Sequence, residues 1–121
     1  MQELMATIDA VGIKTFAAED GRRLVLAIED AGIDILHRCG GKARCTTCRI
    51  ELLAGDAGEI NSREQARLAR EHDLPPNVRL SCQILVEHDL TVRVINRLSE
   101  TTYSDAGPRP TEELPPIEDG H

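Results

Sequence analysis

The chain has 121 residues and a formal net charge of −7, with 40% hydrophobic residues but only 2% aromatic ones. This length predicts a single domain, whose core must be built from aliphatic side chains. The scarcity of aromatic rings argues against a stacking platform for nucleic acid, and no apolar run is long enough to span a membrane, so we expect neither kind of partner.

The first elements predicted along the chain are two short strands and a helix. Residues 6–17 alternate between apolar and polar side chains on either side of Gly12, which indicates two strands joined by a turn. Residues 22–32 carry apolar side chains at helical spacing. The only candidate for the N-cap of this helix is Asp20, and Gly32 predicts its C-terminal end.

Four cysteines then follow in a specific spacing. Cys39, Cys45 and Cys48 form a Cys-x5-Cys-x2-Cys pattern in one glycine-containing loop, and Cys82 comes after 33 intervening residues. Three thiolates from one loop and a fourth from a distant segment suit an iron–sulfur cluster, which is larger than a single ion. The spacing predicts four ligands but does not say which of them share an iron.

Two other uses of the cysteines compete with a cluster. A disulfide framework fits a small secreted chain, but the first residues show no secretory signal, and Cys45 and Cys48 are only three positions apart. A structural zinc site usually takes two close pairs of ligands, whereas Cys82 has no near ligand partner, because the nearest histidine is His88. We therefore favour the cluster and keep a non-redox zinc module as the alternative.

Further strands and one polar helix are predicted after the cysteine loop. Residues 49–55 read as a strand, and Asn61 and Ser62 begin two overlapping capping boxes. These boxes predict a helix that continues to about Glu71, before two prolines. Additional strands are expected at 79–86 and 91–94, separated by a turn at 87–89.

The C-terminal part of the chain has a different composition. From Ser99 to His121 there are six acids and one base, Arg109, together with several prolines. Such a segment has almost nothing to bury. We expect a folded domain at residues 1–97 and an acidic, proline-rich tail at 98–121 that is disordered or lies on the surface.

The order β-β-α-loop-β-α-β-β and its motifs resemble the [2Fe-2S] ferredoxins of the plant and vertebrate types. The resemblance spans roughly residues 6–95. Besides the cysteine loop, its motifs are GIDI at 32–35, LSCQ at 80–83 and TVRV at 91–94. Cys-x5-Cys-x2-Cys is one residue longer than the plant-type spacing and is similar to that of the adrenodoxin and putidaredoxin branch.

This resemblance implies an α+β fold, the β-grasp (ubiquitin-like) mixed sheet with a helix packed across it. It also implies a [2Fe-2S] cluster on Cys39, Cys45, Cys48 and Cys82, with the first two on one iron and the last two on the other. We then expect a one-electron carrier, not an enzyme, that takes electrons from a ferredoxin reductase and passes them to an acceptor enzyme. A ferredoxin dedicated to iron–sulfur cluster assembly is an alternative with the same cofactor.

Two further expectations concern the setting of the carrier. Four reduced cysteines suit a reducing compartment, so we expect a cytoplasmic protein, and we expect it to be a monomer. The chain shows no flavin-binding motif, which argues against a domain detached from a larger oxidoreductase.

The charge of the cysteine loop suggests how the potential is set. The loop has no acid and four bases: Arg38, Lys42, Arg44 and Arg49. Positive charge near a cluster favours the more negative reduced state. We therefore expect a reduction potential above the value of about −400 mV that is typical of plant-type ferredoxins.

The helix before Cys82 departs from the adrenodoxin-like pattern, in which this helix presents acids. Here residues 62–73 mix acids and bases, which favours a salt-bridged surface helix over an acidic docking face. His37 lies two residues before Cys39, and we expect it to be a packed or exposed histidine rather than a modulator of the cluster.

Overall fold

The computed structural model describes residues 5–37, 48–71, 74–100, 105, 107 and 109–112. Several residues that the sequence patterns singled out lie outside this part of the chain: Arg38, Cys39, Lys42, Arg44 and Cys45. Expectations about those residues therefore remain predictions.

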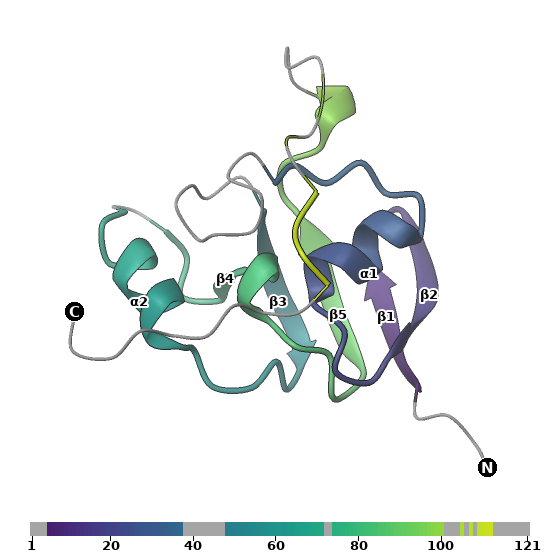
Figure 1. The fold of residues 1–121 in the computed structure, drawn as a ribbon, viewed down its shortest axis with the longest axis horizontal. Helices are drawn as coiled ribbons and strands as arrows, with labels where there is room; N and C mark the ends of the chain where they lie inside the picture. Colours follow the sequence, from purple (N-terminus) through teal and green to yellow (C-terminus); the bar gives the residue numbers. More distant parts are fainter. Residues whose placement is uncertain are drawn as a thin grey trace.

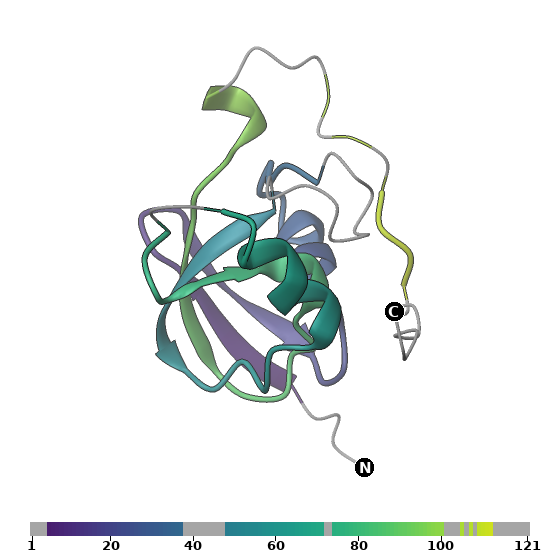
Figure 2. The same ribbon diagram turned by 90° about the vertical axis from the view of Figure 1, so that its left-hand side faces the viewer.

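Five strands form one mixed sheet. They are β1 (Met5–Ala10), β2 (Lys14–Glu19), β3 (Arg49–Gly55), β4 (Val78–Leu80) and β5 (Leu90–Val94). Their order in the sheet is β2-β1-β5-β3-β4 (Figures 1 and 2). The central neighbours β1 and β5 are parallel, and the other three pairs are antiparallel. A mixed sheet with a helix across it confirms the predicted α+β class.

The strands follow the alternation in the sequence. In β1, Ala6, Ile8 and Ala10 are buried, and in β5 the residues at positions 90, 92 and 94 are buried. Because side chains of a strand point alternately to opposite faces, each strand offers one apolar face to the core. The predicted strands at 6–17, 49–55 and 91–94 are confirmed with small shifts of their ends.

Helix α1 (Leu24–Asp30) packs across the sheet, and its residues 24–28 are all buried. Its C-terminal end is as predicted, since Gly32 adopts φ +88° directly after the last turn. The predicted N-cap is wrong, because Arg23 and not Asp20 precedes the helix. Residues 21–24 are instead bound to the chain after β4, where the N–H groups of Gly21 and Leu24 donate to the carbonyls of residues 86 and 84.

Helix α2 (Ser62–Leu68) begins where one of the two capping boxes predicted. The N-cap is Asn61, whose Oδ1 accepts a hydrogen bond of 2.7 Å from the N–H of Glu64. The helix ends at Leu68, about one turn before the predicted limit at Glu71. The N–H groups of Arg70 and Glu71 donate to the carbonyls three residues back, as in a 3-10 turn, and not four residues back.

The predicted strand at 79–86 is wrong beyond Leu80. The chain leaves β4 through a single 3-10 turn, η1 (Ser81–Gln83). The N–H of Ile84 donates to the carbonyl of Ser81, which turns the backbone away from the sheet. The consequence is that Cys82 lies in a turn and not in a strand. A second 3-10 turn, η2 (Leu98–Glu100), follows β5.

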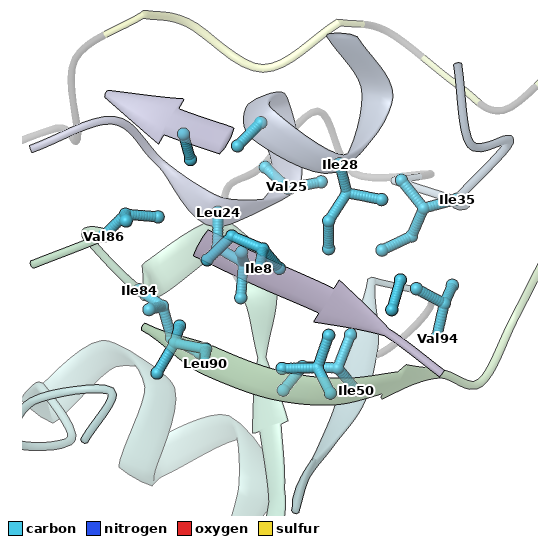
Figure 3. Packing of buried hydrophobic residues seen from close by; sticks show 14 of the residues in the cluster. Ile8, Leu24, Val25, Ile28, Ile35, Ile50, Ile84, Val86, Leu90 and Val94 are labelled. Atoms are coloured by element: carbon cyan, nitrogen blue, oxygen red, sulfur yellow. The ribbon is translucent and has the colours of Figure 1, made fainter. Parts of the chain in front are cut away.

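The core lies between α1 and the sheet (Figure 3). It consists of aliphatic side chains from both layers, such as Ile8, Leu24, Ile28, Ile50 and Leu90. This agrees with the composition, which predicted an aliphatic core, and the partly buried Phe16 packs against it. Within the described residues, no helix is both long enough and apolar enough to cross a membrane.

Candidate functional site

The two cysteines that the structure describes lie next to each other at one end of the sheet. Cys48 directly precedes β3 and Cys82 follows β4, and these strands pair antiparallel with Arg49 opposite Leu80. Both cysteines are at most 1% exposed, and neither forms a disulfide. Antiparallel pairing therefore joins the backbone segments of two cysteines that are far apart in the sequence.

Ser81 joins the two cysteine-bearing segments. Its main-chain N–H donates to the carbonyl of Cys48 over 3.2 Å, and its hydroxyl donates to the same carbonyl over 2.7 Å. Ser81 is fully buried, so both hydrogen bonds are shielded from water. They fix the backbone of Cys48 relative to η1.

The sulfur of Cys82 receives a side-chain hydrogen bond. Nε2 of Gln83 lies 3.3 Å from Sγ of Cys82, and Gln83 is 5% exposed. The other end of the same amide, Oε1, accepts a hydrogen bond of 2.9 Å from Nδ2 of Asn61. Asn61 is the N-cap of α2, so a chain of amide hydrogen bonds connects α2 with the cysteine sulfur.

A buried arginine holds the backbone of Cys82. Arg23 is 0% exposed, and its Nε and Nη2 donate to the carbonyl of Cys82 over 3.0 and 2.8 Å. The sequence does not indicate this role of Arg23, because two adjacent arginines before a helix are typical of solvated side chains. No local signal distinguishes it, since its partner lies 59 positions away.

Residues 109–112, here called the C-terminal segment, lie against α1 (Figure 1). Thr111 accepts hydrogen bonds from Nη1 of Arg23 at its carbonyl (2.9 Å) and its hydroxyl (3.1 Å). Glu112 pairs with Arg22 over 3.0 Å, and Pro110 is buried. Of these four residues only Pro110 is buried, so the C-terminal segment lies on the surface of the domain, which is one of the two states expected for the tail.

Arg109 attaches the same segment to the end of α1. It forms ion pairs with Glu29 and with Asp30, the latter over 3.0 Å. Burial opposes the ionisation of Asp30, but the hydrogen bonds from Arg22 and Arg109 outweigh it and lower the pKa of Asp30. The C-terminal segment is thus held by ion pairs at both ends of α1: one with Arg22, just before the helix, and others with Glu29 and Asp30 in its last turn.

A buried ion pair attaches α2 to the strand that leads to Cys82. Glu64 is 0% exposed, and its two carboxylate oxygens accept from Nε (2.7 Å) and Nη2 (3.0 Å) of Arg79. The N–H of Leu80 donates to the same carboxylate over 2.8 Å. Both oxygens of the buried carboxylate are satisfied, which is what makes its burial tolerable.

The prediction of a salt-bridged surface helix is confirmed only in part. Arg67 and Glu71 form an i,i+4 pair of 2.8 Å, and Arg49 reaches the same carboxylate at 3.7 Å. Glu64, in contrast, is a core residue. Among the described residues 62–71, the two acids, Glu64 and Glu71, are therefore both paired with arginines of the same domain. This arrangement does not favour an acidic docking face.

His37 is a packed histidine, as expected. It is 2% exposed, and its Nε2 pairs with Oε2 of Glu29. Its Nδ1 has no hydrogen-bond partner among the described residues. His88, the histidine nearest to Cys82 in the sequence, is exposed.

The described part of the site suits a cluster of thiolates. Buried thiols are costly to ionise alone, but at Cys82 a donor to the sulfur and a guanidinium on the backbone carbonyl both compensate negative charge. No group of three or more His, Cys, Asp or Glu ligands occurs among the described residues. Those residues include only two of the four cysteines, so the fit can be tested at Cys48 and Cys82 alone.

Comparison with known families identifies a match over most of the chain. Residues 7–87 match the family described as "2Fe-2S iron-sulfur cluster binding domain". This range includes all four cysteines. It also contains β2, β3, β4 and most of β1, and it ends just before β5.

Curated relatives include one subunit of the Na(+)-translocating NADH-quinone reductase of Chlamydia caviae. The two sequences are 32% identical over 83 residues, which is 69% of this chain but 19% of the relative. The corresponding protein of Marinomonas sp. is 34% identical over 88 residues, or 73% of this chain and 21% of the relative. The chain thus spans about a fifth of the length of these relatives.

Solved structures with the same fold include an ISC-like [2Fe-2S] ferredoxin from Pseudomonas putida. The TM-score is 0.62 at 25% identity, and the alignment covers 75% of this chain and 91% of that one. A chain of the covalent putidaredoxin reductase–putidaredoxin complex aligns with a TM-score of 0.58 at 30% identity, over 78% of this chain and 100% of the other. These neighbours confirm the predicted β-grasp fold and the predicted resemblance.

Proposed function

Because the chain belongs to the 2Fe-2S iron-sulfur cluster binding domain family, we propose that it is a one-electron carrier whose cluster is held by Cys39, Cys45, Cys48 and Cys82. The cofactor of the family is a [2Fe-2S] cluster. The observation that supports this ligand set best is the pair Cys48 and Cys82, two buried cysteines whose segments are joined by antiparallel pairing.

The chain's own residues are suited to stabilise added negative charge. When bound, the cluster supplies a one-electron couple whose reduced state is one charge more negative. Gln83 donates to the sulfur of Cys82, and Arg23 donates twice to its carbonyl. Both interactions become stronger when the cluster carries more negative charge, so both stabilise the reduced state.

We propose a ferredoxin reductase as the electron donor. This is supported by the likeness to a chain from a reductase–putidaredoxin complex. The acceptor is an enzyme that the chemistry of the site does not identify, and iron–sulfur cluster assembly remains the alternative acceptor pathway. The carrier is proposed to act as a cytoplasmic monomer, with the domain at residues 1–97 and the tail at 98–121.

A second candidate function follows from the curated relatives. The chain matches about a fifth of one subunit of an NADH-quinone reductase, so it could serve as the electron-transfer module of a larger oxidoreductase. A carrier exchanges electrons with separate proteins, whereas a module works within one assembly. Reduction of cytochrome c by NADH and a putidaredoxin-type reductase, with and without the purified chain, distinguishes them: a carrier accelerates the reaction in proportion to its concentration.

The proposed cofactor is tested on protein purified without air. We expect a red-brown protein with two irons and two acid-labile sulfides per chain that bleaches with dithionite. Cys48→Ser and Cys82→Ser should each lose most of this colour, and Ser62→Ala, an exposed position in α2, serves as the matched control. A colourless protein with one zinc per chain would instead support the zinc module and overturn the carrier.

A further inference from the structure

We infer that Asn61 is a positioning residue that holds the Gln83 amide in the one orientation in which it donates to the sulfur of Cys82, and that this hydrogen bond raises the reduction potential. The inference rests on the proposed function, because Cys82 must be a cluster ligand for it to hold. It concerns residues 61 and 83 only, neither of which is a proposed ligand.

The direction of the hydrogen bonds between Asn61, Gln83 and Cys82 follows from the main-chain N–H of Glu64. The main-chain N–H of Glu64 can only donate, so the atom of Asn61 that faces it at 2.7 Å must be Oδ1. Nδ2 of Asn61 then points to Gln83 at 2.9 Å, where it needs an acceptor, which is Oε1. Nε2 of Gln83 is left facing Sγ of Cys82 at 3.3 Å.

The opposite orientation of Gln83 is unfavourable at both of its ends. A flipped amide would place its NH2 group against the NH2 group of Asn61, and its carbonyl oxygen against the Cys82 sulfur. Gln83 is only 5% exposed, so water cannot easily replace the lost partners. Buried donors and acceptors without partners are costly, which keeps the amide in one orientation.

The hydrogen bond affects the two redox states unequally. A donor to a thiolate ligand is worth more when the cluster carries more negative charge, so it stabilises the reduced state more than the oxidised state. Its loss should therefore lower the equilibrium constant for reduction, by up to about tenfold, which corresponds to about 59 mV for a one-electron couple. Asn61 also caps α2, so the position of α2 and the potential are coupled.

The test is potentiometry of the holoprotein carrying Gln83→Met or Asn61→Asp. Methionine has nearly the length of glutamine but no N–H donor, so the potential should fall. Aspartate keeps the cap of α2 but offers Gln83 only acceptors. Gln83 should then turn its NH2 group toward the carboxylate introduced at position 61 and its carbonyl toward the sulfur, and the potential should fall at least as far.

The control separates this effect from that of an added charge. Asn77→Asp introduces the same carboxylate at a residue whose amide contacts the carbonyl of Leu52 and not Gln83. We expect it to lower the potential much less. The double variant Asn61→Asp/Gln83→Met is compared with Gln83→Met alone. Its potential should be lower by no more than the decrease that Asn77→Asp causes in the wild type, because no glutamine amide is left to be reoriented.

A spectroscopic readout reports the orientation directly. In reduced protein labelled with 15N in glutamine side chains, pulsed EPR should detect a hyperfine coupling from Nε2 of Gln83. This coupling should disappear in Asn61→Asp, although Gln83 is unchanged in sequence. If Asn61→Asp retains the coupling, or lowers the potential equally with and without Gln83, the positioning role is refuted.

Failure of this inference can be told apart from failure of the proposed function. If the wild-type protein holds no [2Fe-2S] cluster, the carrier function itself fails. If the wild type holds the cluster and titrates reversibly, but Gln83→Met has the same potential, only the inference fails. Should Gln83→Met not assemble a cluster, the result with Asn61→Asp decides.

Discussion

The hydroxyl of Ser81 donates a hydrogen bond of 2.7 Å to the main-chain carbonyl of Cys48. It fastens the start of β3 to the turn that carries Cys82, and both residues are buried. The two proposed ligands are therefore held in place by a contact within the polypeptide that does not require a metal.

We predict that Ser81→Ala destabilises the protein by about 1 kcal/mol, the usual worth of a buried hydrogen bond. The carbonyl of Cys48 keeps its second donor, the N–H of Ser81, so the fold should survive. The free energy of unfolding and the rate at which iron is lost to a chelator measure the effect, with Ser62→Ala as the exposed control. An unchanged rate of iron loss would show that the contact does not support the ligands.

The buried pair of Glu64 and Arg79 should be much more sensitive to substitution than a surface pair. Glu64→Ala leaves a nearly buried guanidinium without its carboxylate and is expected to cost about 3–5 kcal/mol. Glu51→Ala breaks a pair of similar length, 2.8 Å, with Arg93 at the surface and should cost about 1 kcal/mol or less. Denaturant unfolding of both variants checks this difference, and equal losses would contradict it.

Gly55 is needed at the end of β3 for two reasons. It adopts φ +100°, and a Cβ there would lie 2.3 Å from the carbonyl oxygen of Asp89. Gly55→Ala should therefore cost more than about 2 kcal/mol. Gly12→Ala is the matched control, since it has φ +78° but no heavy atom within 4 Å, and should cost only the backbone strain of about 1 kcal/mol. Thermal unfolding of the two variants measures both costs, and the difference between them gives the contribution of the steric clash with Asp89 beyond the backbone strain.

Asp34 should remain ionised at unusually low pH. Burial opposes its ionisation, but hydrogen bonds from the N–H of Ser99 (2.7 Å) and from Arg97 (2.6 Å) outweigh it and lower its pKa to about 2. Because the folded pKa is depressed, the carboxylate contributes stability above about pH 4, and this is lost as the pH falls toward 2.

The measurement for Asp34 is a titration of carboxyl carbon shifts by NMR between about pH 7 and pH 4, in which Asp34 should not titrate. Asp34→Asn should lower the free energy of unfolding at pH 7 by about 1 kcal/mol, after allowance for solvent screening. A midpoint for Asp34 near pH 4 would disprove the assigned role of Ser99 and Arg97.

The C-terminal segment is predicted to protect the site through Arg23. A chain shortened after residue 108 loses the contacts of Thr111 with Arg23 and the ion pairs of Arg109 and Glu112. We expect this chain to unfold more easily and to lose iron several-fold faster. A chain shortened after Glu112 keeps all of these contacts and is the matched control. Equal rates of iron loss from the two chains would show that residues 109–112 are dispensable.

Local sequence patterns were sufficient to predict much of this protein. Alternation of apolar residues located the strands of the sheet, Asn61 marked the start of α2, and the cysteine spacing indicated the cofactor. The strand and helix signals lie within a few residues of the features that they predict, and three of the four cysteines lie in one short loop. Local backbone preferences and ligand spacing carry such information because they do not depend on the rest of the fold.

Only the tertiary structure decided what surrounds the site. The turn at η1, the burial of Arg23, the contact of Gln83 with Asn61 and the contact of Thr111 with Arg23 were not predicted. Arg23 contacts residues 59 and 88 positions away, and Asn61 contacts a residue 22 positions away. A charged or amide side chain is buried only when distant parts of the chain supply its hydrogen-bond partners, and no local pattern records that they do.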